Sequence, residues 1–147
     1  MANVERRAHV VWEGDLASGS GRLTEEDSGA LNEAPVTFAT RTGSPEGQTS
    51  PEELIASAHA TCYAMALSNT LAEKDTPPER LTVDAVCTLD DEQLKITTID
   101  LDVRGTVPDI DDDEGFQNAA QEADQICPVT NALRGNVEVR VNARLER

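Results

Sequence analysis

Two cysteines, Cys62 and Cys127, have the residue type and the surroundings that thiol chemistry needs. Cys62 lies in a run of small and apolar residues, where interior packing is the alternative role because free cysteine is often buried. Cys127 directly precedes Pro128 at the expected start of a short helix, where amide dipoles favour a thiolate. Such a pair can reduce a peroxide, because one thiol becomes a sulfenic acid and the second condenses with it to a disulfide. The residue types and spacing alone do not decide whether Cys62 and Cys127 pack in the interior or perform redox chemistry.

Three other features with chemical potential have a simpler interpretation. Cys87 shares the inward face of an expected strand with aliphatic residues, which favours core packing. His59 precedes Cys62 by one helical turn, so it either contacts the thiol or packs within the helix, and packing is the simpler role. The acidic run 109–114 lacks the glycine and spacing of a calcium loop and resembles a solvated helix start. No C-x-x-C is present, so we expect neither a metal site nor a cofactor.

A long helix is expected to position Cys62. Ser50 is a good N-cap, Pro51 suits the first helical position, and Glu53 completes a capping box with Ser50. Glu52 and Glu53 complement the positive end of the helix dipole. Residues 54–67 are apolar or small on nearly every face, which predicts a buried central helix.

Alternating patterns predict strands on both sides of this helix. Residues 4–12 are expected to form a strand, EGDLASGSGR a hairpin turn, residues 22–40 short strands broken at Ser28-Gly29 and Pro35, and residues 41–48 a loop. After Pro77-Pro78, two strands with one apolar face predict an antiparallel sheet. A second helix is expected to end near Cys127-Pro128, followed by a short helical piece to Arg134. A last strand with the same alternation follows Gly135. The residues expected to face the core are, strand by strand, Val83, Ala85, Cys87 and Leu89; Thr97, Ile99, Leu101 and Val103; and Val137, Val139, Val141, Ala143 and Leu145.

Composition narrows the classes of function. The 147 residues include 28 acidic and 12 basic side chains, with a net charge of -16 and a pI near 4.3. This charge repels phosphate backbones and anionic lipids, so we expect no nucleic-acid and no membrane partner. It fits a salt-rich cytoplasm or a bias in genome composition. No apolar run reaches membrane length and no secretory signal is visible at the start, so we expect a cytoplasmic protein with one domain over residues 1–147.

The stretches SPEELIASAHATCYAMALS and QICPVTNALRGNVEVRVNARL resemble the OsmC/Ohr superfamily of organic hydroperoxide reductases. The resemblance covers nearly the whole chain, and HVVWEGDLASGSG, SGALNEAPVTFATR and IDLDVRGTVPDID fit the OsmC branch. It implies that Cys62 is the peroxidatic thiol, Cys127 the resolving thiol, Arg41 the stabiliser of the thiolate and Glu52 the partner of Arg41. These roles agree with physical chemistry, since a buried thiolate needs a nearby cation and arginine can hold a carboxylate with two parallel hydrogen bonds.

The spacing of Glu52 and Cys62 adds a constraint. Ten residues of straight helix separate them by about 15 Å, so direct contact within one chain is not expected. Either Arg41 bridges from a mobile loop, or Glu52 serves the site of a partner subunit. The family's intertwined dimers favour the second option.

The resulting prediction is an α+β fold, an antiparallel sheet wrapped around a buried central helix in an intertwined homodimer. The resemblance implies reduction of organic hydroperoxides to alcohols in oxidative or osmotic stress, through a Cys62 sulfenic acid and a Cys62–Cys127 disulfide. An external dithiol, such as a lipoylated protein, then regenerates the thiols. Two alternatives stay open: a binding or structural protein with little turnover, and a relative with another thiol chemistry such as hydrolysis.

Overall fold

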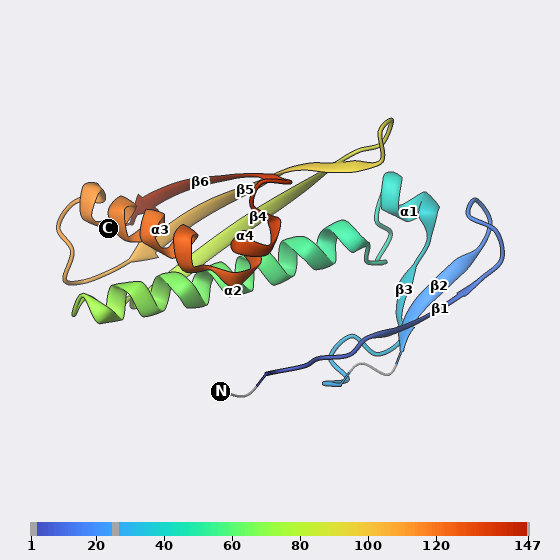
Figure 1. Cartoon of the computed structure of the whole chain (residues 1–147), viewed down its shortest axis with the longest axis horizontal. Helices are drawn as coiled ribbons and strands as arrows, with labels where there is room; N and C mark the ends of the chain where they lie inside the picture. Colours follow the sequence, from blue (N-terminus) through green and yellow to red (C-terminus); the bar gives the residue numbers. More distant parts are fainter. Residues whose placement is uncertain (1–2, 25–26, 147) are drawn as a thin grey trace. The chain divides into compact units, whose positions relative to one another are not determined.

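The computed structural model describes residues 3–24 and 27–146, which fall into two compact units, Met1–Glu53 and Leu54–Arg147 (Figure 1). Glu25 and Glu26, in the stretch expected to form short strands, lie outside the described residues, as do Met1 and Ala2. Organisation as a single domain stays a prediction.

The N-terminal unit is a small antiparallel sheet followed by one helical turn. Its strands β1 (His9–Glu13), β2 (Ser20–Thr24) and β3 (Ala34–Val36) pair in the order β1-β2-β3, and the expected hairpin joins the first two. Pro35 lies inside β3 rather than breaking it, which an edge strand tolerates because one side needs no N–H donor. Arg41 lies in the helix α1 (Phe38–Thr42), not in a loop, because the Thr37 hydroxyl accepts a hydrogen bond from the Thr40 N–H and caps a turn.

The C-terminal unit has a three-stranded sheet in the order β4-β5-β6, covered on one face by helices (Figure 1). Its strands are β4 (Arg80–Asp90), β5 (Lys95–Thr106) and β6 (Glu138–Leu145). Its helices are α3 (Asp113–Ile126), α4 (Pro128–Leu133) and most of α2 (Pro51–Glu73). The mixed α and β class is thereby confirmed. The sheet itself is mixed and not purely antiparallel, because β6 returns parallel to β5 after the crossover through α3 and α4.

One hydrophobic core holds the C-terminal unit together. Tyr63, Leu67 and Leu71 of α2 are buried there, and the opposite side of α2 is open in the single chain, with Met65 68% exposed. Close packing of α3 depends on a glycine of β5, because a Cβ at Gly105 would lie 2.6 Å from the ring of Phe116. The other buried members of the core include Ile99, Leu101, Val103, Ala119, Ala120, Ala123 and Ala143.

The predicted strand faces are confirmed except at one position. Ile99, Leu101 and Val103 are buried, but Thr97 is exposed. An irregularity in the β4–β5 register leaves Thr97 without a paired residue and turns Ile96 toward the core in its place.

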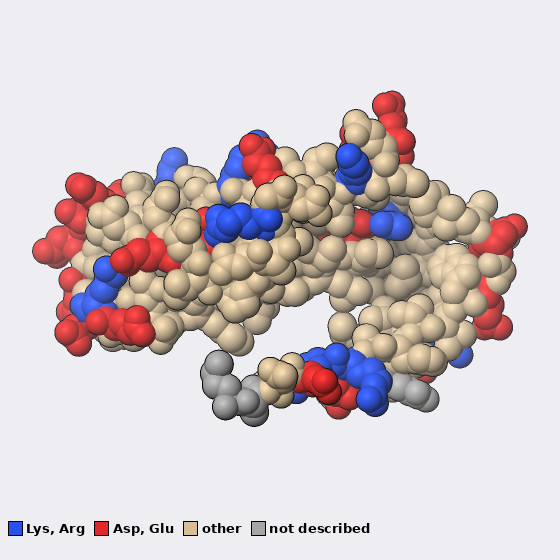
Figure 2. All heavy atoms as spheres, viewed as in Figure 1, with Lys and Arg blue, Asp and Glu red and all other residues tan. Residues whose placement is uncertain are grey.

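Acidic side chains are prominent on the visible surface, with fewer basic side chains among them (Figure 2). Some form surface ion pairs, such as Arg140 with Asp100 across the parallel β5–β6 pair, at 2.6 Å. Within residues 3–24 and 27–146, no helix has both the length and the apolar character needed to cross a membrane.

Candidate functional site

The start of α2 is fixed by the predicted cap. The hydroxyl of Ser50 accepts a hydrogen bond from the Glu53 N–H at 3.0 Å, and the Thr49 hydroxyl donates to the Glu53 carboxylate at 2.8 Å. Pro51 occupies the first position of the helix. This cap fixes the position of Glu52 in the first turn.

Arg41 and Glu52 form a two-pronged ion pair inside the N-terminal unit. Arg41 Nε donates to Glu52 Oε1 at 2.9 Å, and Arg41 Nη2 donates to Glu52 Oε2 at 2.8 Å. The side chains are 30% and 10% exposed, respectively. Hydrogen bonding to Arg41 lowers the pKa of Glu52 against the opposing effect of burial, and the same bonds raise the pKa of Arg41. The predicted pairing is confirmed, and its catalytic role stays a prediction.

Cys62 and Cys127 lie within hydrogen-bonding reach of each other in the C-terminal unit. Cys62 is half-buried on α2, and Cys127 is fully buried at the N-cap of α4. Burial raises the pKa of Cys62, as does the neighbouring Cys127 thiol, whereas a hydrogen bond from the Val129 N–H acts to lower this pKa. Within residues 54–146, no cationic side chain is among these influences. The fold therefore brings together two thiols that are 65 positions apart in sequence, and Cys62 is the more accessible of the two.

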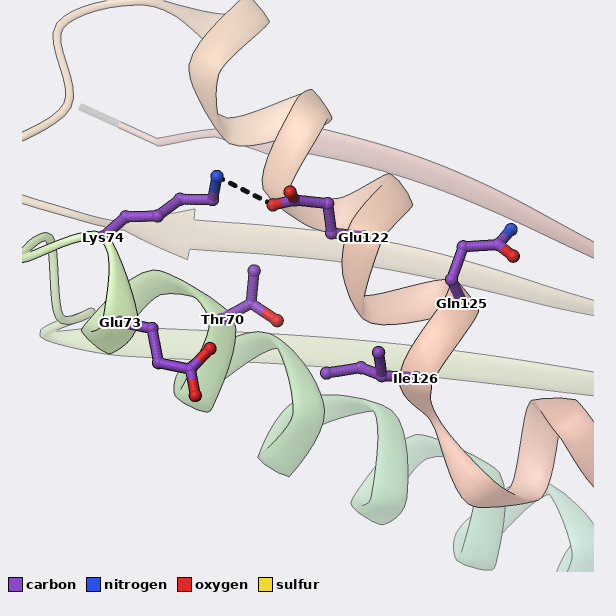
Figure 3. Close-up of a pocket in the computed structure, with 6 residues that line it drawn as sticks. All are labelled: Thr70, Glu73, Lys74, Glu122, Gln125 and Ile126. Carbon is purple, nitrogen blue, oxygen red and sulfur yellow. Dashed lines mark ion pairs between the residues drawn. The ribbon is translucent and has the colours of Figure 1, made fainter.

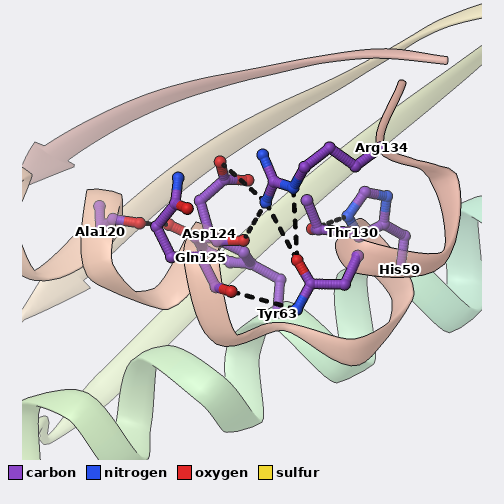
Figure 4. A network of polar contacts seen from close by, with 8 residues as sticks. His59, Tyr63, Ala120, Asp124, Gln125, Thr130 and Arg134 are labelled. Atoms are coloured by element: carbon purple, nitrogen blue, oxygen red, sulfur yellow. Dashed lines mark hydrogen bonds and ion pairs between the residues drawn. The ribbon is translucent and has the colours of Figure 1, made fainter. Parts of the chain in front are cut away.

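A buried polar contact links the two elements that carry these thiols (Figure 4). His59 Nε2, on α2, lies 2.7 Å from the hydroxyl of Thr130, on α4, and both side chains are almost completely buried. Burial lowers the pKa of His59, and the nearby Asp124 carboxylate opposes this effect. His59 therefore makes a polar contact with α4 in addition to its packing within α2. Thr130 was not predicted, because its contact with His59 joins residues 71 positions apart in sequence and depends on tertiary packing.

A second set of contacts fastens α4 to the end of α3. Arg134 Nη2 donates to the Asp124 carbonyl at 2.9 Å (Figure 4). Asn131 Nδ2 donates to the Gln125 carbonyl at 3.1 Å. Tyr63 donates its hydroxyl proton to the Ala120 carbonyl at 2.7 Å, which ties α2 to α3. The short helix α4 is thus held by α2 through His59 and Thr130 and by the end of α3 through Arg134 and Asn131.

A groove lies between α2 and α3 and reaches Ile126, which directly precedes Cys127. It has a volume of about 480 Å³, its lining side chains come from both helices, and the Lys74–Glu122 ion pair spans it at 2.9 Å (Figure 3). No cysteine is among its lining residues, and Thr70 lies about 12 Å beyond Cys62 along α2. The lining residues are Thr70, Glu73, Lys74, Glu122, Gln125 and Ile126.

The remaining candidates fit structural roles. Cys87 is half-buried in β4 and packs against the hydrophobic core. Within the part of the chain that the structure describes, no group of three or more His, Cys, Asp or Glu side chains is placed to hold a metal ion.

Comparison with known proteins assigns this arrangement to a family. The model of the OsmC-like protein family matches residues 43–142, which include Cys62, Cys127 and Glu52. The chain belongs to the OsmC-like family. Peroxiredoxin OsmC of Escherichia coli (strain K12) is 38% identical over 136 residues, covering 91% of this chain and 93% of the relative.

Two further comparisons concern the sequence and the fold. An organic hydroperoxide resistance protein of Xanthomonas axonopodis pv. citri is 27% identical over 95% of this chain and 96% of its own length. The crystal structure of an organic hydroperoxide resistance protein from Elizabethkingia anophelis superposes with a TM-score of 0.74 at 22% identity, over 99% of this chain and 100% of the other, which shows a shared OsmC-like fold.

Proposed function

We propose that this OsmC-like protein is a thiol peroxidase that reduces organic hydroperoxides to alcohols in stress defence. The observation that carries the proposal is the pairing of a half-buried Cys62 thiol with a fully buried Cys127 thiol. A relative at 38% identity is named a peroxiredoxin, and a second relative is named an organic hydroperoxide resistance protein. These names and the thiol pair agree on the same chemistry.

The first step is attack by the more accessible thiol. The Cys62 thiolate attacks the terminal oxygen of the hydroperoxide, an S–O bond forms, the O–O bond breaks, and the alkoxide leaves as the alcohol after taking up a proton. The Val129 N–H donates to Cys62 and favours the thiolate, but burial opposes it. A cation is therefore needed near Cys62 during attack.

Arg41 is the proposed source of this cation. Glu52 holds the guanidinium plane through two hydrogen bonds and leaves the remaining N–H donors available for a thiolate or a peroxide oxygen. Because Glu52 lies about 15 Å along the helix from Cys62, we assign the Arg41–Glu52 pair of one chain to the thiols of a partner chain in a homodimer.

The second step uses Cys127. Its thiol attacks the Cys62 sulfenic acid, an S–S bond forms, the S–O bond breaks, and the thiol proton leaves with the hydroxyl group as water. An external dithiol then reduces the Cys62–Cys127 disulfide by thiol exchange and becomes a disulfide itself. Lipoylated proteins and small dithiols have the required chemistry.

A peroxide assay with matched cysteine variants tests this function. Wild type and Cys87→Ala are expected to consume cumene hydroperoxide and dihydrolipoamide at equal rates, because Cys87 is half-buried in β4 and packs against the hydrophobic core. Cys62→Ser is expected to be inactive, and Cys127→Ser to complete one turnover and stop at the Cys62 sulfenic acid, visible by mass spectrometry. Wild-type activity in Cys62→Ser refutes the mechanism. Absence of dithiol consumption by wild type indicates a binding protein, and ester cleavage without peroxide reduction indicates a hydrolase.

A further inference from the structure

The short helix α4 carries two groups that act on Cys62, although it has only six residues. Cys127 is its N-cap, and the Val129 N–H in its first turn donates to Cys62. A helix of this length has little stability of its own, so its position depends on contacts with its neighbours. What fastens α4 to α2 therefore determines the geometry of the thiols.

The His59–Thr130 contact is a buried polar link between these two helices. His59 is 0% exposed and Thr130 is 1% exposed, and the two side chains join residues 71 positions apart in sequence. His59 lies one turn before Cys62 on α2, and Thr130 lies three residues after Cys127. The link thus spans from the helix that carries one thiol to the helix that carries the other (Figure 4).

Burial of a histidine at this place has a cost that packing alone does not explain. His59 Nδ1 and Asp124 Oδ1 are buried without a hydrogen-bond partner among the described residues. A phenylalanine or leucine would fill the space without an unpartnered nitrogen. The hydrogen bond from the other ring nitrogen, at 2.7 Å, gives the histidine a directional contact that an apolar side chain lacks.

We propose that His59 is a positioning residue that, through its hydrogen bond to Thr130, holds α4 so that Cys127 and the Val129 N–H both face Cys62. This inference rests on the proposed peroxidase function for its use in disulfide formation. His59 touches neither thiol in this role and transfers no proton. The bond it governs is the S–S bond, which forms as the Cys62 S–O bond breaks and water leaves.

Thr130→Val tests the link, because valine keeps the shape and removes only the hydroxyl. Two thiol properties are measured without any peroxide. The first is the pKa of Cys62, from the pH dependence of its alkylation in a Cys87→Ala background with Cys127→Ser. The second is the equilibrium between Cys62–Cys127 disulfide and glutathione, in Cys87→Ala alone. We expect Thr130→Val to lower the thiolate fraction of Cys62 by about tenfold and the equilibrium constant for forming the disulfide by about tenfold. A tenfold change corresponds to the loss of one charged hydrogen bond or to a similar loss of alignment.

Matched variants separate positioning from general stability. Thr130→Ser keeps the hydroxyl and is expected to restore both thiol properties. Tyr63→Phe removes a buried hydroxyl bond of the same kind, from α2 to α3 instead of α4, and is expected to lower the unfolding midpoint without changing either thiol property. His59→Phe breaks the link from the other side and serves in place of Thr130→Val if that variant does not fold.

The outcomes distinguish the two proposals. A lower thiolate fraction and a weaker disulfide in Thr130→Val, both restored in Thr130→Ser, support the positioning role of His59. This holds even if wild type reduces no peroxide, in which case only the proposed peroxidase function fails. A wild-type thiol pKa and a wild-type disulfide equilibrium in the folded Thr130→Val or His59→Phe protein overturn the positioning role. Equal changes in Tyr63→Phe also overturn it, because they reduce the effect to general stability.

Discussion

Removing Arg41 should destabilise the protein more than removing Glu52, although both changes break the same ion pair. Arg41→Ala leaves a carboxylate that is only 10% exposed without its two hydrogen bonds of 2.8 and 2.9 Å. Glu52→Ala leaves a guanidinium that is 30% exposed and that water can reach.

The magnitudes follow from this difference in exposure. Fully buried pairs cost about 3–5 kcal/mol when one partner is removed, whereas exposed pairs contribute about 0.2–1 kcal/mol. The Arg41–Glu52 pair lies between these limits. We expect a loss of about 2 kcal/mol for Arg41→Ala and about 1 kcal/mol for Glu52→Ala.

Urea unfolding followed by tryptophan fluorescence measures both losses. Trp12 is the only tryptophan of the chain and lies on β1, in the same unit as the ion pair, so its signal reports the part that the substitutions affect. Protein concentration is held constant, because subunit association changes apparent stability.

Acidification supplies an internal control for this prediction. Arg41 lowers the pKa of Glu52 in the folded protein, so the stabilisation is complete above the unfolded value of 4.5 and is lost as the pH falls through the lowered folded value. The deficit of Arg41→Ala should therefore shrink in strong acid. A larger loss for Glu52→Ala, or a deficit that does not change with pH, refutes the reasoning.

Four further outcomes are expected. Arg41→Ala raises the pKa of Cys62 as read from iodoacetamide alkylation, and Arg41→Lys restores it only in part because lysine lacks the planar fork; an unchanged alkylation profile contradicts this role. Cys62→Ser and Glu52→Ala subunits, each inactive alone, regain activity when mixed, and no recovery in heterodimers seen by native mass spectrometry excludes the shared site. Cys87→Ala lowers the unfolding free energy by about 1 kcal/mol in urea titrations, while a loss of turnover means that the resolving thiol is misassigned. Burial lowers the pKa of His59, so wild type loses stability as the pH falls below 6.5, and thermal melts of His59→Phe should lack that part of the loss.

Much of the fold was accessible from local patterns in the sequence. Ser50 and Pro51 located the start of α2, and alternating residues located β4, β5 and β6, because caps and burial faces are decided by nearby residues. The direction of β6 was not accessible, since alternation is the same in parallel and antiparallel strands. The helix α1 was missed because five residues provide no helical period, and its cap at Thr37 resembles a strand residue.

The candidate site was accessible only through family resemblance. No spacing rule brings Cys62 to Cys127 across 65 positions, and their approach depends on how α4 packs against α2. The two hydrogen bonds between Arg41 and Glu52 agree with the geometry expected for these residue types. The link from His59 to Thr130 had no local signature, because it depends on tertiary packing of residues far apart in sequence.

Parallel pairing of β5 with β6 determines when during synthesis the thiol pair is assembled. The hairpin β4–β5 forms between neighbouring segments, but the crossover that carries Cys127 closes only when β6, which follows both cysteines in sequence, has left the ribosome and paired. A nascent chain that has exposed both cysteines therefore still lacks the completed sheet on which α3 packs. Chains released before β6 is synthesised should expose their cysteines as unfolded thiols that can mispair, so the thiol pair matures only after β6 has paired with β5.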